Sequence, residues 1–202
     1  IWFRGAAHGT VLTLANSANT TLINAYTTSY LGQLTVSDMR LQGNKANNTS
    51  GTGLIFASGA GRVFNIVSQD FDNDGFVFQD PSGGSSFDLF VDHLYAYGND
   101  RYGVNIDCAD GNYDSLQVHH NNYGLYSKDH GNNRISNLYA YGNTLGAIYL
   151  IGVTNNILSV GKIAQTAATG YGIILEADPA VGGSDVSYNI IANYEIVGSG
   201  VA

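Results

Sequence analysis

A glycine followed by a short apolar strand recurs along the chain at intervals of 21 to 28 residues. A second, alternating strand precedes most of these glycines, and three examples, residues 94–99, 116–121 and 138–143, are nearly superimposable. A unit of this size cannot bury an apolar face alone, so successive units must stack and share one core. The repeat glycines are Gly53, Gly75, Gly103, Gly124, Gly146, Gly172 and Gly200.

The repeat predicts an all-β chain folded as a right-handed, single-stranded parallel β-helix of about seven to eight coils. A propeller blade needs about 40 residues, and a leucine-rich repeat would show its own consensus. Because coils stack at about 4.8 Å, an asparagine that closes three successive strands is expected to form a ladder at one corner. These residues are Asn99, Asn121 and Asn143. We expect residues 1–202 to be one domain, and a fragment of a longer chain because the last coil is unfinished.

Composition excludes several other classes of protein. Only 12% of the residues are charged, with two Glu and three Lys, so surface helices have little to be built from. A net charge of −8 disfavours a nucleic acid as partner. The one Cys excludes a disulfide scaffold, and no apolar run is long enough to span a membrane.

Strand alternation separates inward from outward side chains in the superimposable strands. The Leu, Ala and Val residues at 94, 96, 116, 118, 138 and 140 are expected to point inward. Outward tyrosines on a rigid face suit stacking on sugar rings, or alternatively packing against a loop or another subunit. The adjacent His119 and His120 are expected on opposite faces, unable to share one metal ion. The outward set is Tyr95, Tyr97, Gln117, His119, Tyr139 and Tyr141.

Residues 1–14, residues 34–44 and the coils that follow resemble the pectate-lyase-like right-handed β-helix superfamily, in the form found in phage tailspikes and other surface proteins that act on polysaccharides. The resemblance implies the fold and leaves the activity open, since members include lyases, hydrolases, epimerases and non-catalytic adhesins. It implies a polysaccharide or cell-surface glycan as partner and an extracellular, cell-surface or virion location. A homotrimer or neighbouring β-helix segments are the protein partners it suggests.

Acidic residues follow the glycine strands of three neighbouring coils, namely Asp80, Asp107 and Asp129. Stacking separates the carboxylates of adjacent coils by about 5 Å and those of next-nearest coils by about 10 Å. This range covers the distances between the two catalytic carboxyl groups in retaining and in inverting glycosidases. Lys128 and His130 lie beside them in the sequence. The alternative is that these aspartates cap turns.

Residues 104–107 and 128–129 resemble polygalacturonase-type hydrolases, which carry Asn-Thr-Asp and Asp-Asp on successive coils. The chain departs from that pattern at Ile106 and Lys128, and residues 150–152 read Leu-Ile-Gly where Gly-His-Gly would stand. The resemblance therefore carries over only to Asp107 and Asp129.

The segment 70–75 places Asp70, Asp72 and Asp74 in the alternating pattern of a calcium loop, although Pro81 stands where an EF-hand would have Glu. With calcium there, Lys128 or Arg134 would be the base of a polysaccharide lyase. Three functions thus stay open: a carbohydrate-recognising β-helix, with or without cleavage of its ligand through paired aspartates, a structural or adhesive β-helix, and a calcium-dependent lyase.

Overall fold

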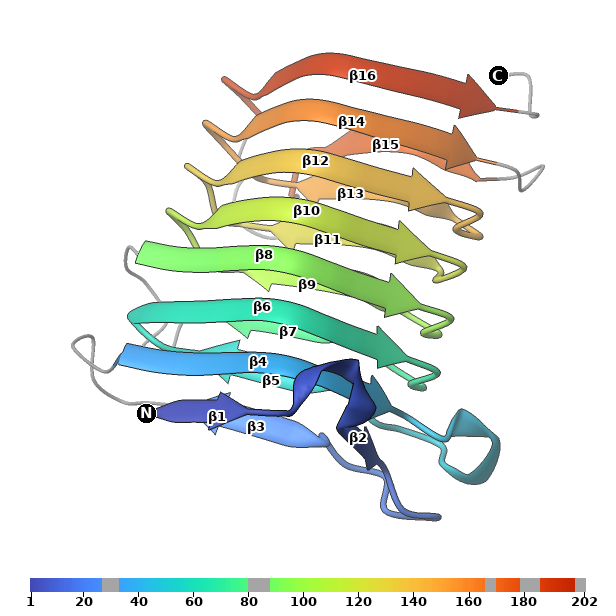
Figure 1. Cartoon of the computed structure of the whole chain (residues 1–202). Coiled ribbons are helices and arrows are strands. Elements are labelled where there is room, and N and C mark those ends of the chain that lie inside the picture. The colour runs from blue at the N-terminus through green and yellow to red at the C-terminus, as the bar shows by residue number, and fades with distance from the viewer. Residues whose placement is uncertain (27–32, 80–87, 166–169, 179–185, 199–202) are drawn as a thin grey trace.

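The computed structural model describes residues 1–26, 33–79, 88–165, 170–178 and 186–198 (Figure 1). The chain winds as a right-handed solenoid, with long strands on one side and short strands behind them, as the sequence predicts (Figure 1). Every strand pairing is parallel, and consecutive coils lie directly on one another.

Two sheets contain the strands of successive coils. The long strands are β4 (Gln33–Gln42), β6 (Ala60–Gln69), β8 (Asp88–Tyr97), β10 (Asn112–His119), β12 (Arg134–Tyr141), β14 (Ile157–Gln165) and β16 (Ile190–Gly198). The short strands are β3 (Ile23–Tyr26), β5 (Leu54–Ala57), β7 (Phe76–Gln79), β9 (Tyr102–Asp107), β11 (Tyr123–Lys128), β13 (Gly146–Ile151) and β15 (Tyr171–Glu176). The strand order in each sheet follows the chain from coil to coil.

The N-terminal coil is built from shorter pieces. Strands β1 (Trp2–Arg4) and β2 (Val11–Thr13) both pair with β4, and the 3-10 helix η1 (Ala7–Gly9) lies between them. A second 3-10 turn, η2 (Lys45–Asn47), follows β4. The described strands thus form seven complete coils and begin an eighth with β16, which confirms the predicted architecture. No helix among the described residues could span a membrane.

Each long strand bends at its middle, at a residue in the left-handed backbone conformation (Figure 1). The bend divides the strand into a first arm before this residue and a second arm after it. The pairing on either side of the bend aligns these residues into one column. The column is Asp38, Asn65, His93, Ser115, Asn137, Val160 and Asn193, with φ between 50° and 61°.

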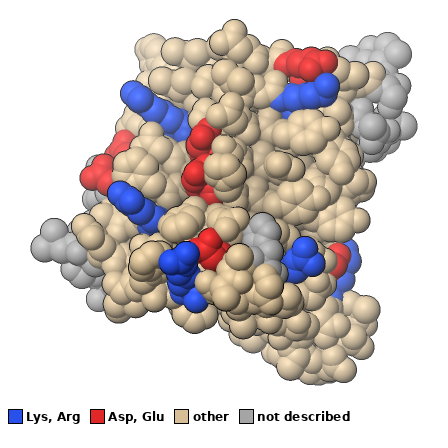
Figure 2. Space-filling model, in the orientation of Figure 1, with Lys and Arg blue, Asp and Glu red and all other residues tan. Residues whose placement is uncertain are grey.

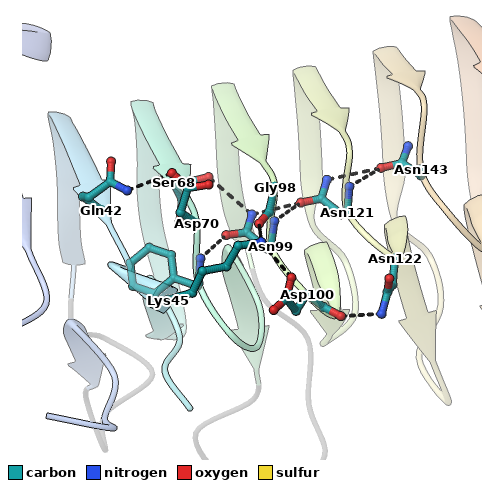
Figure 3. Close-up of polar contacts among 11 residues, drawn as sticks. Gln42, Lys45, Ser68, Asp70, Gly98, Asn99, Asp100, Asn121, Asn122 and Asn143 are labelled. Atoms are coloured by element: carbon teal, nitrogen blue, oxygen red, sulfur yellow. Dashed lines mark hydrogen bonds and ion pairs between the residues drawn. The ribbon is translucent and has the colours of Figure 1, made fainter. Parts of the chain in front are cut away.

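The predicted asparagine ladder turns the corner after the second arms (Figure 3). The side-chain oxygen of Asn121 accepts hydrogen bonds from the backbone and side-chain N–H groups of Asn99, at 3.0 Å each. Asn143 accepts the same pair of bonds from Asn121. All three asparagines are buried, so the ladder satisfies backbone groups that the corner would otherwise leave unpaired inside the protein.

A second ladder, which the sequence analysis did not identify, turns the corner after the short strands. Asn133 accepts from the N–H of Gly111 at 2.9 Å, Asn156 accepts from Asn133, and Asn189 accepts from Asn156. Each coil therefore has three corners: the bend in the long strand and one turn at either end of the short strand. In the coils of β10 and β12 both turns carry a ladder asparagine.

The interior is a continuous apolar stack. The expected inward residues of the superimposable strands are all at most 1% exposed, which confirms the alternation. The strand register confirms the glycine column from Gly53 to Gly124. A side chain would not fit at Gly103, because a Cβ added there would lie 2.7 Å from the carbonyl oxygen of Gly124.

The placement of Gly146 is wrong by one residue. Gly146 pairs with Tyr123, and Ala147 occupies the column position above Gly124. The reason is that the turn after Asn143 is one residue longer than the turn after Asn121. Gly172 again lies in the column, beside Ala147, whereas Gly200 is outside the described residues.

Val160 is the one β-branched member of the bend column, with φ 52° and 51% exposure. A left-handed backbone is costly for such a side chain and far less so for Asn. We expect Val160→Asn to raise the free energy of unfolding by about 1 kcal/mol, measured by urea denaturation. The reverse exchange, Asn137→Val, should lower it by a similar amount. An unchanged midpoint in both variants would contradict strain at the bend.

Candidate functional site

A groove of about 800 Å³ runs across the second arms of the long strands from β4 to β12. Apart from the inward-pointing Leu94, it is lined by side chains that point outward and by those of the bend column. At its N-terminal end η1 packs against β4 and β6. The lining residues are Arg40, Asn65, Val67, Gln69, His93, Leu94, Tyr95, Tyr97, Ser115, Gln117, Asn137 and Tyr139. Four of the six predicted substrate-binding residues therefore lie in one groove.

The other two predicted residues, His119 and Tyr141, support the groove wall. The His119 ring lies parallel to Tyr141 at 4.4 Å and contacts the rings of Tyr95 and Tyr97 at 4.6 and 4.8 Å between centroids. It points outward as expected but is only 3% exposed, because the tyrosines cover it. Its role here is to hold the aromatic rings rather than to meet solvent. Burial also raises the pKa of Tyr95.

The expectation that His119 and His120 face apart is wrong. Their Nδ1 atoms are 3.0 Å apart. Strand β10 ends at His119, and His120 occupies the corner with φ 56°, so its side chain falls on the same side as that of its neighbour. Strand alternation does not apply beyond the last strand residue.

The predicted catalytic residues gather at a different corner, after β9 and β11. The Lys128 ammonium lies 2.9 Å from Asp178, which is buried, and 3.5 Å from Asp129. His130 Nε2 lies 3.2 Å from the Asp107 carboxylate on the adjacent coil. Burial is the main cause that raises the pKa of Asp129, and a hydrogen bond with the Asp178 side chain raises it further. Asp80 lies outside the described residues.

This cluster holds its charges in pairs. The hydrogen bond to Asp178 and the charge of Asp129 raise the pKa of Lys128, so the amine keeps its proton at neutral pH and is a poor general base. Arg134, the other basic group named for a lyase, is exposed at the start of β12.

A second aromatic surface, not found from the sequence, covers the outside of the short strands. Tyr102 and Tyr126 stack in parallel at 4.2 Å, and Tyr149 meets Tyr126 edge-on at 5.5 Å. Burial and the neighbouring tyrosine raise the pKa of Tyr126 to about 12. The Tyr149 hydroxyl donates to Glu176 on the next coil. The sequence repeat of 21 to 28 residues could have predicted this surface, because the tyrosines recur close to the repeat glycines.

The groove and the acidic cluster are separated by the fold. The groove lies on the second arms, whereas Asp107 is the last residue of β9 and Asp129 follows β11, at the corner opposite those arms. A ligand in the groove therefore does not reach the cluster.

In the segment expected to be a calcium loop, two of the three carboxylates have separate partners elsewhere in the chain. Asp74 is fully buried and receives two bonds from Arg101, at 2.6 and 2.5 Å. Asp70 accepts a hydrogen bond from Gln42 (Figure 3) and another from Gln69. Burial and the charge of Asp100 raise the pKa of Asp72. No three His, Cys, Asp or Glu side chains in the described ranges converge as a metal site.

No known protein family matches the sequence, and no curated protein does. Among solved structures, the chain is similar to the A-modules of the Azotobacter vinelandii mannuronan C-5 epimerases AlgE4 and AlgE6. The sequence identity is 15% to the AlgE4 module and 14% to the AlgE6 module, and the TM-scores are 0.47 and 0.44. The alignments cover all of this chain and 83% and 84% of the two modules.

The buried His119 predicts a pH-dependent stability. Burial, then the charge of His120, lowers the pKa of His119 from 6.5 to about 4. Between these values the unfolded chain binds a proton that the folded protein does not, so stability is present above pH 6.5 and falls towards pH 4. We expect wild type to lose about 2–3 kcal/mol more than His119→Gln over this range, in urea denaturation with a chelator present.

Glutamine is a matched replacement because Gln42 and Gln69 occupy the same outward column. The exposed His93 provides the control, because it lies at the bend of β8 and takes no part in the ring contacts of His119, so His93→Gln should keep the loss of stability that His119 causes. Parallel pH profiles for wild type and His119→Gln would show that His119 is not the titrating group.

Proposed function

We propose that this protein binds an extended polysaccharide along the groove of the second arms. The observation that carries the proposal is the open groove itself, which runs parallel to the solenoid axis and displays tyrosine rings and amide side chains. Coils repeat at about 4.8 Å, which is close to the length of one pyranose ring, so successive coils present equivalent positions to successive sugars.

The chemistry of the groove suits sugars. Tyr139 and Tyr97 are each 36% exposed and offer ring faces or edges for stacking. Gln69, Gln117 and Asn137 supply donors and acceptors for hydroxyl groups. Strands hydrogen-bonded on both sides hold these groups in place before the ligand arrives, which lowers the entropy lost on binding.

The charge distribution favours a neutral or anionic glycan. None of the lining residues carries a carboxylate, although the chain has 16 acids and 8 basic residues. Arg40, which is exposed, contributes the fixed positive charge of the groove. Figure 2, viewed on this face, shows mostly uncharged side chains over the right-hand halves of the long strands. We place such binding at a cell surface, on a virion or otherwise outside the cell.

The test is the loss of glycan binding in Tyr139→Ala. Removing a stacked ring should cost about 1–2 kcal/mol, or roughly tenfold in affinity, measured on a glycan array and then by calorimetry with the glycan retained. Tyr171→Ala is the matched control, because Tyr171 is 65% exposed on the other sheet, away from the groove.

The competing proposal is a structural or adhesive β-helix in which the tyrosine face is buried between chains, as in a homotrimer. Light scattering on the same variants separates the two. A trimer that Tyr139→Ala dissociates, with no glycan bound by wild type, would contradict the binding proposal.

The acidic corner favours a second candidate function, cleavage of a polysaccharide by paired carboxyl groups. Asp129 has a raised pKa and shares a hydrogen bond with Asp178, as a general acid requires. Asp107, held by His130, would be the base or nucleophile. The polymer would then lie on the outer surface of the short strands, against Tyr102 and Tyr126. The calcium-dependent lyase is disfavoured, because Lys128 keeps its proton and Asp74 is occupied by Arg101.

Cleavage is tested with Asp129→Asn, since Asn tolerates the φ of 57° at this position. We expect release of reducing ends to fall at least about 100-fold, as for loss of an acid catalyst. Asp92→Asn, on the first arm of β8, should retain full activity. Full activity in Asp129→Asn, or no cleavage of bound polymers by wild type, would refute this function and leave the binding proposal standing.

A further inference from the structure

Two imidazole rings converge at the corner after β10. The Nδ1 atoms of His119 and His120 are 3.0 Å apart, and this contact is independent of the groove and of the proposed function. The contact exists because His120 occupies the left-handed corner position. In the same column stand Gly43, Asp70, Gly98 and Gly142, so none of these described corners brings two such rings together.

At this distance one Nδ1 must donate a hydrogen bond and the other must accept it, so one of the two nitrogens carries no proton. Moving the donor's proton from Nδ1 to Nε2 of the same ring frees both Nδ1 lone pairs. Two neutral imidazoles then face one another through nitrogens, with no proton lost from the pair. Neutral imidazole is the form that binds metals.

The spacing is that of a chelate, and the exposed ring supplies the direction. With the ring centroids 5.3 Å apart, the two Nδ1 atoms point at one another as in a hydrogen bond, so the His120 ring must turn for both lone pairs to meet at one ion. With metal–nitrogen bonds of about 2.0–2.1 Å, two nitrogens 3.0 Å apart subtend about 91–97° at the metal. This is the angle between adjacent positions of a tetragonal ion such as Cu²⁺ or Ni²⁺, and Cu²⁺ binds nitrogen ligands most tightly in the divalent series. We propose that His119 and His120 chelate a divalent transition metal ion through their two Nδ1 atoms, with Cu²⁺ preferred.

The surroundings fix one ligand and leave the other open. The rings of Tyr95, Tyr97 and Tyr141 pack around His119, which limits its rotation. His120 is exposed, and a Cβ on Gly142 would stand 3.3 Å from its Nε2, so the glycine leaves room beside the ring. In the part of the chain that the structure describes, no third His, Cys, Asp or Glu completes the site. Water would fill the remaining positions.

The experiment titrates the whole protein with CuSO₄ and follows binding by calorimetry and electron paramagnetic resonance. Wild type should bind one Cu²⁺ at this site with a two-nitrogen signature. His120→Asn and His119→Gln should each lower the affinity at least about tenfold and leave at most one nitrogen from the pair. Both replacements suit their columns. Asn tolerates the left-handed backbone at position 120, and Gln69 lies two coils before His119 in the same outward column.

His93→Gln is the control, because His93 is exposed and lies 2.7 Å from Asp92, at the bend instead of the corner. It should bind Cu²⁺ as wild type does. Equal affinity in wild type and His120→Asn would overturn the proposal, as would a signature with one nitrogen in wild type. Tighter binding of Zn²⁺ or Ni²⁺ than of Cu²⁺ would overturn the assigned metal. Because His120 is exposed, His120→Asn decides the question even if His119→Gln unfolds.

Discussion

The backbone hydrogen bonds between consecutive coils are the constraint on which the rest of the structure depends. They require each coil to turn its corners at the same places as the coil beneath it, whatever the length of the intervening turns. Left-handed residues provide the bend, and buried asparagines satisfy the backbone at the other two corners. A residue in such a column is therefore selected by backbone geometry first and by its side-chain chemistry second.

That order explains which parts of the fold could be predicted from the sequence. The alternation Leu94, Ala96 and Leu116, Val118 identifies the inward face, because strand geometry allows no other arrangement. The corners are harder to predict, since a turn can gain a residue without disturbing the strands, as the turn after Asn143 does. The second ladder was missed for a related reason, because Asn133 is one of several asparagines in a polar turn and nothing marks it as buried.

The candidate site shows the same division. The groove was predictable because its residues lie within strands, where position fixes direction. The role of Asp74 could not be predicted, because the same Asp-x-Asp spacing occurs in cation-binding loops and in turns that hold a buried ion pair. Its partner, Arg101, lies 27 residues away in the sequence. The acidic cluster depends on Asp178, whose pairing with Lys128 follows from stacking across two coils. Local sequence patterns cannot report such partners.

A column of outward side chains also makes the two ends of the groove surface different in charge. Along the second arms one column reads Arg40, Val67, Tyr95, Gln117, Tyr139, Lys162 and Glu195. A positive charge stands at one end, aromatic and amide groups follow, and an ion pair of 3.1 Å closes the other end. Because a paired charge attracts a ligand less than an isolated one, the column is electrostatically asymmetric. A polymer with distinct ends therefore has unequal energies in its two orientations along this groove, and the rigidity of the stacked coils preserves that difference.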